Sequence, residues 1–211
     1  MKVVLFGATG DTGKPLVRHL LLEGHEVTVI VRKPEKFDLS GERLEVEKGD
    51  VLKPSTIKGK LTGKEAVLSV LGGNHRQPTT VYSEGMENII NEMERAGVKR
   101  LVCLSAETLK SKEESSFTER ILVIVLWKVF HNLYSDMERM EEKIKKSTID
   151  WTIVRPPYLT KGAPKGHYRM NLDKPIPKGK GRITRSDLAL AMIHLLKNPD
   201  SIHSIAYVCT N

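Results

Sequence analysis

The chain of 211 residues has little of what several protein classes require. Its only cysteines, Cys103 and Cys209, supply neither a disulfide framework nor the spacing of a zinc site, so we expect no metal. Aromatic residues make up 5% of the chain, which leaves few side chains to stack on nucleic-acid bases. The longest apolar run, Ile121–Trp127, is far shorter than a membrane span. These scarcities argue against a secreted disulfide scaffold, a nucleic-acid-binding module and a membrane-spanning protein.

The N-terminus shows no signal peptide, because a predicted strand begins at once in place of a charged segment, an apolar core and a cleavage site. We therefore expect a cytoplasmic protein. The net charge of +8 is dispersed, with lysines and arginines often beside acidic residues, as is typical of a solvated surface. This charge is compatible with a phosphate-bearing cofactor. The sequence shows no basic recognition helix, which argues against DNA binding.

The segment that organises the chain is a strand followed by spaced glycines. Val3–Phe6 is an apolar run too short for a buried helix, which predicts a central parallel strand. Gly7, Gly10 and Gly13 follow at three-residue spacing, and the apolar face of a helix begins directly behind them. In this order the first glycine permits a tight turn, the second lets the backbone approach a pyrophosphate, and the third lets the helix pack closely on the strand.

The pyrophosphate of a dinucleotide would lie at the positive end of that helix, where N–H groups have no partner within the helix. Thr9 and Thr12 can add hydroxyl donors. An ordinary glycine turn between a strand and a helix is the alternative, but the order of strand, glycines and helix favours a cofactor.

Strands and helices alternate along the rest of the chain. Apolar and alternating runs predict further strands at 26–31, 44–48, 65–71, 99–105, 151–155 and 205–208. The stretch 162–181, rich in Pro, Gly and Lys, predicts irregular structure, and Thr184 is expected to cap the last helix. The pattern indicates an α/β fold: a doubly wound, mostly parallel sheet flanked by helices, a Rossmann fold in one domain over residues 1–211. Substrate-side excursions are expected at about 106–130 and 158–183.

Arg32 follows the second predicted strand, at the place that lies over the adenosine ribose in a dinucleotide fold. An acidic side chain there marks NAD, whereas a basic one accommodates the 2′-phosphate of NADP. Arg32, supported by Lys36 or Lys33, therefore favours NADPH over NADH; a basic loop at a helix start is the alternative. Asp50, at the end of the third predicted strand, can reach the adenine or cap the following turn.

Gly72 and Gly73 end the fourth predicted strand, where glycines permit the close approach of a ligand. Ser105 ends the fifth, and its hydroxyl either faces a nicotinamide or caps the next turn. A helix predicted over 117–146, for which a break is one alternative, includes the apolar run Ile121–Trp127. That run fits a lid or pocket wall best, a dimer face next, and an interfacial membrane helix third.

Several segments together resemble the atypical short-chain dehydrogenase/reductase proteins. These segments are Gly7–Gly13, Val31–Arg32, Gly49–Val51, Leu71–Gly72, Pro78–Gly85, Ser105 and Pro156–Pro157. Within the NAD(P)H-binding, NmrA-like part of that group, they are most similar to the small biliverdin IXβ reductase/NADPH-dependent flavin reductase family. The resemblance covers about residues 2–208, and Pro78–Gly85 and the Pro-Pro pair are its more specific parts.

The resemblance implies NADPH across the strand ends, with Gly10–Gly13 around the pyrophosphate and Leu71 near the nicotinamide. The expected cofactor-binding residues are Gly7, Thr9, Gly10, Asp11, Thr12, Gly13, Arg32, Lys36, Asp50, Val51, Leu71, Gly72, Gly73, Ser105 and Pro156. Hydride would pass to a planar acceptor such as a flavin, a quinone or a linear tetrapyrrole. The cofactor carries most of that chemistry, so the protein mainly positions the reactants.

Two positions depart from that family. Tyr158 stands where the reductase has a histidine after the Pro-Pro pair, and Met137 stands roughly where it has a second pocket histidine. Tyr158 and Lys161 are three residues apart rather than four, so the Tyr-x-x-x-Lys pair of the main dehydrogenase family is absent. We therefore expect Ser105 and Tyr158 as the catalytic side chains, with water as the other possible proton donor.

The sequence thus predicts an NADPH-dependent oxidoreductase with a small planar acceptor, as a monomer or weak homodimer. The alternative is a non-catalytic NADP(H)-binding redox sensor that acts through a protein partner, which the missing histidines and the apolar run favour. Epimerase or dehydratase action on a nucleotide sugar is disfavoured by the short substrate region and the missing Tyr-x-x-x-Lys pair.

Overall fold

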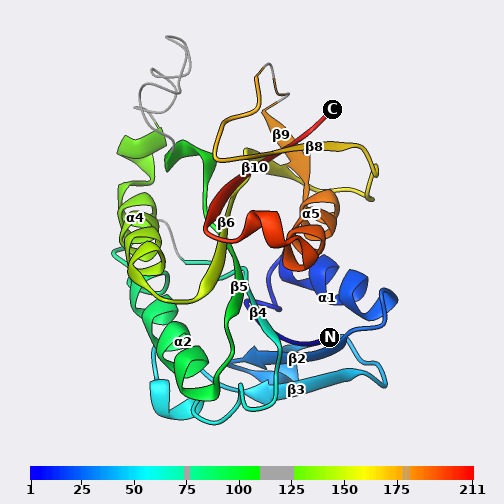
Figure 1. Cartoon of the computed structure of the whole chain (residues 1–211), viewed down its shortest axis with the longest axis vertical. Coiled ribbons are helices and arrows are strands. Elements are labelled where there is room, and N and C mark those ends of the chain that lie inside the picture. Colours follow the sequence, from blue (N-terminus) through cyan, green and yellow to red (C-terminus); the bar gives the residue numbers. More distant parts are fainter. Residues whose placement is uncertain (74–76, 110–125, 178, 180) are drawn as a thin grey trace.

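One twisted sheet of eight strands runs through the computed structural model (Figure 1). The structure describes residues 1–73, 77–109, 126–177, 179 and 181–211. The strands of this sheet are β1 (Lys2–Phe6), β2 (Glu26–Val31), β3 (Leu44–Lys48), β4 (Ala66–Ser69), β5 (Arg100–Leu104), β6 (Asp150–Arg155), β8 (Tyr168–Leu172) and β10 (Ser204–Thr210). Their order is β3-β2-β1-β4-β5-β6-β10-β8, and every neighbouring pair is parallel except β10 with β8.

This order is that of a doubly wound Rossmann-like sheet, so the predicted fold class is confirmed. The chain winds outward from β1 in one direction to β3 and then returns to β4 on the other side of β1. Ligands of open α/β sheets bind at the point where the order reverses, beyond the carboxyl ends of the strands. In this chain that point lies between β1 and β4.

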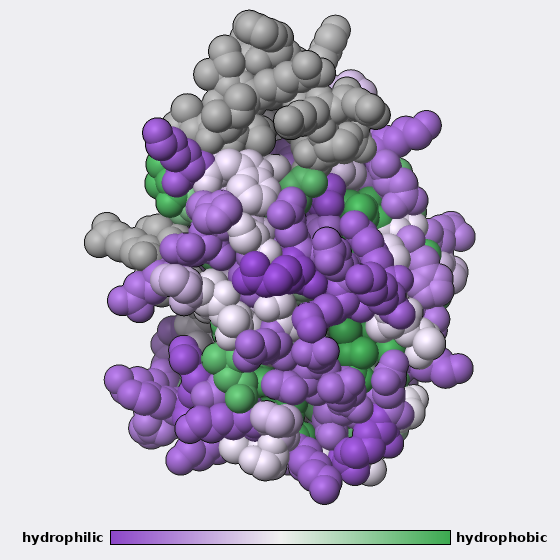
Figure 2. All heavy atoms as spheres, turned by 90° about the vertical axis from the view of Figure 1, so that its left-hand side faces the viewer, coloured by the Kyte–Doolittle hydropathy of each residue, from purple (hydrophilic) through white to green (hydrophobic). Residues whose placement is uncertain are grey.

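Helices cover both faces of the sheet (Figure 1). The helices α1 (Gly13–Leu22) and α5 (Arg185–Lys197) lie on one face, and α2 (Ser83–Ala96) and α4 (His131–Lys146) lie on the other. Side chains of β1 alternate between the two cores, as the two-residue period of a strand requires. The outer surface on the side of α2 and α4 is mostly hydrophilic, with apolar side chains in small separate areas (Figure 2).

Four short 3₁₀ turns connect these elements in the described residues: η1 (Pro34–Lys36), η2 (Pro54–Thr56), η3 (Glu107–Leu109) and η5 (Pro199–Ser201). A second, two-stranded parallel sheet joins β7 (Tyr158–Thr160) to β9 (Arg182–Thr184). Because β7 starts two prolines after β6, this small sheet lies next to the carboxyl end of the main one.

The prediction of irregular structure over 162–181 is wrong in part, because β8 lies within it and pairs antiparallel with β10. Tyr168, Met170 and Leu172 alternate along β8 and pack, partly buried, against the core under α5. The flanking prolines, glycines and lysines conceal this short alternation in the sequence. The strand covers the edge that β10 would otherwise expose.

The helix predicted over 117–146 is interrupted in its described part, with helical residues 126–129, a bend at Phe130 and then α4. Residues 117–125, which hold most of the apolar run, lie outside the described residues. Thr184 caps α5 as predicted: its Oγ1 accepts from the backbone N–H of Asp187 at 3.0 Å and donates to Asp187 Oδ2 at 2.7 Å. None of the helices in the described ranges has the length and apolar character needed to cross a membrane.

Candidate cofactor and acceptor site

The parallel register brings the predicted site residues to one edge of the sheet. Each group follows the carboxyl end of a strand: Gly7–Gly13 after β1, Arg32 and Lys36 after β2, Asp50 and Val51 after β3, Leu71–Gly73 after β4, Ser105 after β5, and Pro156 after β6. Tyr158 lies just beyond, as the first residue of β7.

Gly7 and Gly13 stand where only glycine fits. Gly7 has a φ of +84°, and a Cβ there would lie 2.3 Å from the carbonyl oxygen of Val70. The turn after β1 therefore touches the chain that leaves β4. A Cβ on Gly13 would lie 2.2 Å from the carbonyl oxygen of Gly7, so α1 packs directly on the turn. Gly10 is different, because its Cβ would meet only the Gly7 oxygen, at 3.4 Å.

The first turn of α1 offers unused backbone donors. Lys14 N–H donates to the carbonyl of Gly10 at 3.1 Å, but the N–H groups of Asp11, Thr12 and Gly13 donate to no acceptor within the described chain. The Thr12 side chain makes no capping hydrogen bond, and Gly10 and Asp11 are exposed. Free N–H groups at a helix N-terminus bind phosphate oxygens, so this turn fits the pyrophosphate of a dinucleotide.

Three exposed cations, Arg32, Lys33 and Lys36, follow the end of β2. Arg32 and Lys36 are exposed, and their side chains form no hydrogen bond or ion pair with any described residue. Asp38, which the sequence analysis did not single out, is bound to Lys14 at 2.8 Å. The hydrogen bond from Lys14 holds the pKa of Asp38 below its usual value. Asp38 is therefore already paired, while Arg32 and Lys36 remain available to an anion.

Asp50 makes the local cap that the sequence offered as one alternative. Its Oδ1 accepts the N–H of Leu52 at 3.1 Å, and its own N–H donates to Thr56 Oγ1 at 2.9 Å. These bonds fix the turn that follows β3 and leave the adenine contact as a prediction.

Val51 and Leu71 meet on the first turn of α2. A Cβ on Gly85 would lie 2.8 Å from Val51 Cγ2 and 3.5 Å from Leu71 Cδ1, so glycine lets this helix approach both strand ends. The carbonyl of Val51 accepts from Asn88 Nδ2 at 2.8 Å. The chain segments that follow β3 and β4 therefore both pack on the first turn of α2.

The glycine pair after β4 is held by Tyr82. Gly73 N–H donates to Tyr82 Oη at 2.9 Å, whereas a Cβ on Gly72 would meet nothing within 4 Å. Tyr82 is in turn fixed by Asp136 of α4, which is fully buried and accepts the N–H groups of Tyr82 and Ser83 at 2.9 and 3.3 Å, together with the Ser83 hydroxyl. This carboxylate caps α2 from another helix, which sequence spacing did not reveal.

Ser105 belongs to a buried polar network. Its hydroxyl donates to Glu141 Oε1 at 2.6 Å, and Glu141 accepts Arg155 Nε at 3.0 Å and Nη2 at 2.6 Å. Arg155 Nη1 donates to Tyr207 Oη at 3.0 Å. Burial raises the pKa of Glu141, but the hydrogen bonds and charge of Arg155 outweigh it, so the net pKa lies below its usual value. The single hydroxyl proton of Ser105 therefore points at a carboxylate, and its oxygen is left to accept from a further donor.

One residue in the sequence, Arg155, signals this buried network. Arg155 ends an apolar strand directly before Pro156, and a charge in such a place requires a buried partner. The spacing of Glu141 and Lys145 suits an i,i+4 ion pair on a helix surface, and that pair exists, at 3.2 Å, but Glu141 itself is buried. The i,i+4 spacing of Glu141 and Lys145 is the same whether the carboxylate lies on the helix surface or is buried, so it does not predict the buried network.

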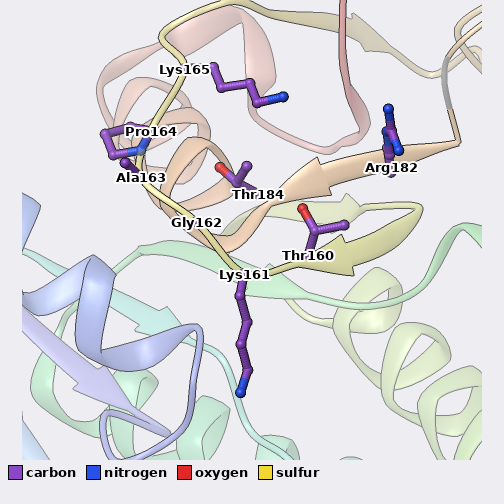
Figure 3. A pocket seen from close by; sticks show the side chains of 8 residues that line it. All are labelled: Thr160, Lys161, Gly162, Ala163, Pro164, Lys165, Arg182 and Thr184. Carbon is purple, nitrogen blue, oxygen red and sulfur yellow. The ribbon is translucent and has the colours of Figure 1, made fainter.

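Tyr158 stands apart from this network. Its side chain is 75% exposed, and within the described chain no hydrogen bond joins it to Ser105. The small sheet that it begins borders a groove of about 500 Å³ (Figure 3). Among the described residues, no group of His, Cys, Asp and Glu side chains is placed to hold a metal ion. Cys103 and Cys209 are both buried free thiols.

Comparison with protein families matches residues 7–199 to the NAD(P)H-binding family. The chain belongs to that family. The match begins at the first glycine of the turn after β1 and extends through β7, β9 and α5. Both the unused donors of α1 and the small second sheet therefore lie within the matched residues.

Similar proteins agree with this assignment. An uncharacterized chloroplastic protein of Arabidopsis thaliana is 25% identical over 98% of this chain and 76% of its own length. The oxidoreductase ylbE of Lactococcus lactis superposes with a TM-score of 0.84 at 22% identity, over 100% of this chain and 91% of its own. A wide-type short-chain dehydrogenase/reductase of Veillonella parvula, in complex with NADP, has a TM-score of 0.82 at 16% identity, over 99% and 94% of the two chains. At these identities the structures show a shared fold.

Length separates this chain from other relatives. It spans about a third of four further curated relatives, two of which are photosystem II assembly factors. The activity of any whole relative therefore does not transfer directly.

Proposed function

We propose that this NAD(P)H-binding protein is an NADPH-dependent oxidoreductase that passes hydride to a flavin-, quinone- or tetrapyrrole-like acceptor. The observation that carries the proposal is the row of unused N–H donors at Asp11, Thr12 and Gly13, placed at the point where the sheet order reverses. Three adjacent donors at a helix N-terminus suit a pyrophosphate.

The preference for NADPH rests on Arg32 and Lys36. Both cations are exposed and have no partner in the described chain, so a 2′-phosphate would meet them without breaking an existing ion pair. NADH lacks that phosphate and would leave both unused. A guanidinium and an ammonium together suit a phosphate dianion.

The hydrogen bonds of the described residues support the proposed catalytic roles. When bound, the cofactor supplies the hydride. Ser105 gives its proton to Glu141, so its oxygen would accept from a donor such as the nicotinamide carboxamide and would fix the ring. Tyr158 keeps a free phenolic hydroxyl at an exposed position, which makes it the side chain that can donate a proton to a reduced acceptor.

The test is NADPH oxidation followed by absorbance with FMN, a quinone and biliverdin as acceptors, beside an NADPH binding titration. We expect tight NADPH binding and turnover with at least one acceptor. Tyr158→Phe should lower kcat and leave the NADPH dissociation constant unchanged. Absence of NADPH binding would overturn the proposal, and binding without turnover would favour the second candidate.

The second candidate is an NADP(H)-binding redox sensor that acts through a protein partner. Two relatives carry the name of assembly factors, which is a role in association with other proteins. The cytoplasmic location and the monomeric or weakly dimeric state also stay predictions, and the name of the Arabidopsis relative places that protein in chloroplasts.

A further inference from the structure

The groove beside the small β7–β9 sheet is lined by basic and neutral residues only. Its lining consists of Thr160, Lys161, Gly162, Ala163, Pro164, Lys165, Arg182 and Thr184. The three basic side chains form no ion pair with any residue in the described ranges. The three cations repel one another and no carboxylate lines the groove, so the arrangement favours an anion there. The neighbouring carboxylate of Asp187 is fully buried and already accepts hydrogen bonds from Lys165, Gly166 and Thr184.

Two of these cations share one side of the small sheet. In Figure 3, Lys165 and Arg182 extend on the same side of the ribbon, whereas Lys161 extends in the opposite direction. The Thr160 hydroxyl donates to the carbonyl of Ile183 at 3.3 Å, and so it is partly engaged. The charge on that side therefore comes from an ammonium and a guanidinium on two different segments.

The segment that carries Lys165 is fixed in place. The backbone N–H groups of Lys165 and Gly166 both donate to Oδ1 of Asp187, each at 2.9 Å. Asp187 is fully buried and is held by Thr184 at the N-terminus of α5. A charge on a pinned backbone loses less entropy on binding than one on a free loop, so this site is partly preorganised.

The groove also adjoins the tyrosine expected to act in catalysis. Tyr158 is the register partner of Arg182 in the β7–β9 pair. Register partners in a parallel sheet lie side by side, so a molecule bound at Arg182 would have its other end within reach of this tyrosine. An anionic tail and a reacting ring could then occupy one continuous surface.

We propose that Lys165 and Arg182 bind the phosphate monoester of a planar acceptor, which makes phosphate-bearing acceptors the preferred substrate class. That the bound molecule accepts hydride rests on the proposed function, whereas phosphate binding in the groove does not depend on turnover. A phosphate carries close to two negative charges and several acceptor oxygens, which suits one guanidinium and one ammonium.

The experiment compares FMN with riboflavin, which share the isoalloxazine ring and differ by one phosphate. Dissociation constants are measured by flavin fluorescence, with and without NADP⁺. We expect FMN to bind roughly tenfold more tightly than riboflavin, as for one or two charge-assisted contacts at an exposed site. The difference should shrink as the salt concentration rises.

The variant Lys165→Gln/Arg182→Gln should bring the two constants to within roughly twofold of each other. Lys174→Gln removes one exposed charge after β8, outside the groove, and should preserve the FMN preference. Because the two groove side chains are exposed, the double variant should keep its free energy of unfolding.

Equal binding of the two flavins, binding of neither, or an FMN preference that survives in the double variant would overturn the phosphate site. The NADPH titration separates the two proposals. An FMN preference without NADPH binding would support the groove and overturn the reductase. NADPH oxidation by a quinone without any FMN preference would do the reverse.

Discussion

The carboxylate of Glu141 and the guanidinium of Arg155 join α4 to β6 through two hydrogen bonds of 3.0 and 2.6 Å. Both side chains are less than a tenth exposed, at 4% and 8%. The same carboxylate takes the hydroxyl proton of Ser105, so the position of a predicted catalytic group depends on this ion pair. A buried charge that loses its partner is costly, which makes the pair directly testable.

Glu141→Gln should lower the free energy of unfolding by about 3–5 kcal/mol, because it leaves the Arg155 charge buried without a counter-charge. Urea denaturation measures the change. Glu142→Gln, at the next and exposed position of α4, is the matched control and should change stability by less than about 0.5 kcal/mol. Equal effects of the two variants would show that the pair is not buried as described.

The same carboxylate predicts a dependence on pH. The pKa of Glu141 in the folded protein lies below its usual value of 4.5, since Arg155 outweighs the effect of burial. A depressed pKa contributes stability that is present above the unfolded value and is lost as the pH falls through the folded one. Unfolding free energy should therefore fall below about pH 4.5, and less steeply in Glu141→Gln. Parallel pH curves for the two proteins would contradict this assignment.

The alternation of strand and helix patterns along the chain was enough to predict the sheet. Apolar runs bounded by glycine and proline indicate buried parallel strands without knowledge of the strands they pair with. The glycine spacing was equally readable, since Gly13 meets Gly7 within a short stretch of chain, whereas the close approach of Gly7 to Val70 joins residues far apart in the sequence. The buried carboxylates that hold the site residues in place could not be predicted from the sequence. Asp136 reaches Tyr82 across 54 positions, and Glu141 reaches Ser105 across 36, so no local spacing records either contact.

The strand β8 shows a second reason why sequence patterns fail to predict part of the fold. Its alternation of Tyr168, Met170 and Leu172 is present in the sequence, but the neighbouring prolines, glycines and lysines are the stronger local signal. Pairing with β10 decides the outcome, and that pairing joins residues such as Leu172 and Ala206 that lie far apart in the chain. Tertiary contact here outweighs local composition.

The glycine turn predicts a contrast between two alanine variants. Gly13→Ala would place a methyl carbon 2.2 Å from the Gly7 oxygen, so we expect a loss of several kcal/mol in unfolding free energy. Gly10→Ala meets only that oxygen, at 3.4 Å, and should retain stability to within about 1 kcal/mol. It should nevertheless weaken NADPH binding at least roughly tenfold, because the second glycine of such a turn lets the backbone approach the pyrophosphate closely. Unchanged affinity in a folded Gly10→Ala protein would remove the pyrophosphate from this turn.

Arg32→Ala tests the choice between the two nicotinamide cofactors. Because Arg32 has no partner in the described chain, its removal should not change stability, and any effect on binding reports on the ligand alone. We expect the NADPH dissociation constant to rise roughly ten- to a hundredfold, the range of one charge-assisted phosphate contact, with less than about a threefold change for NADH. Lys146→Ala, an exposed cation on α4, controls for net charge and should change neither constant. Isothermal titration of both cofactors decides the question. Equal losses for NADPH and NADH would place Arg32 away from the 2′-phosphate, and the other exposed cations after β2, Lys33 and Lys36, would then be the residues to substitute.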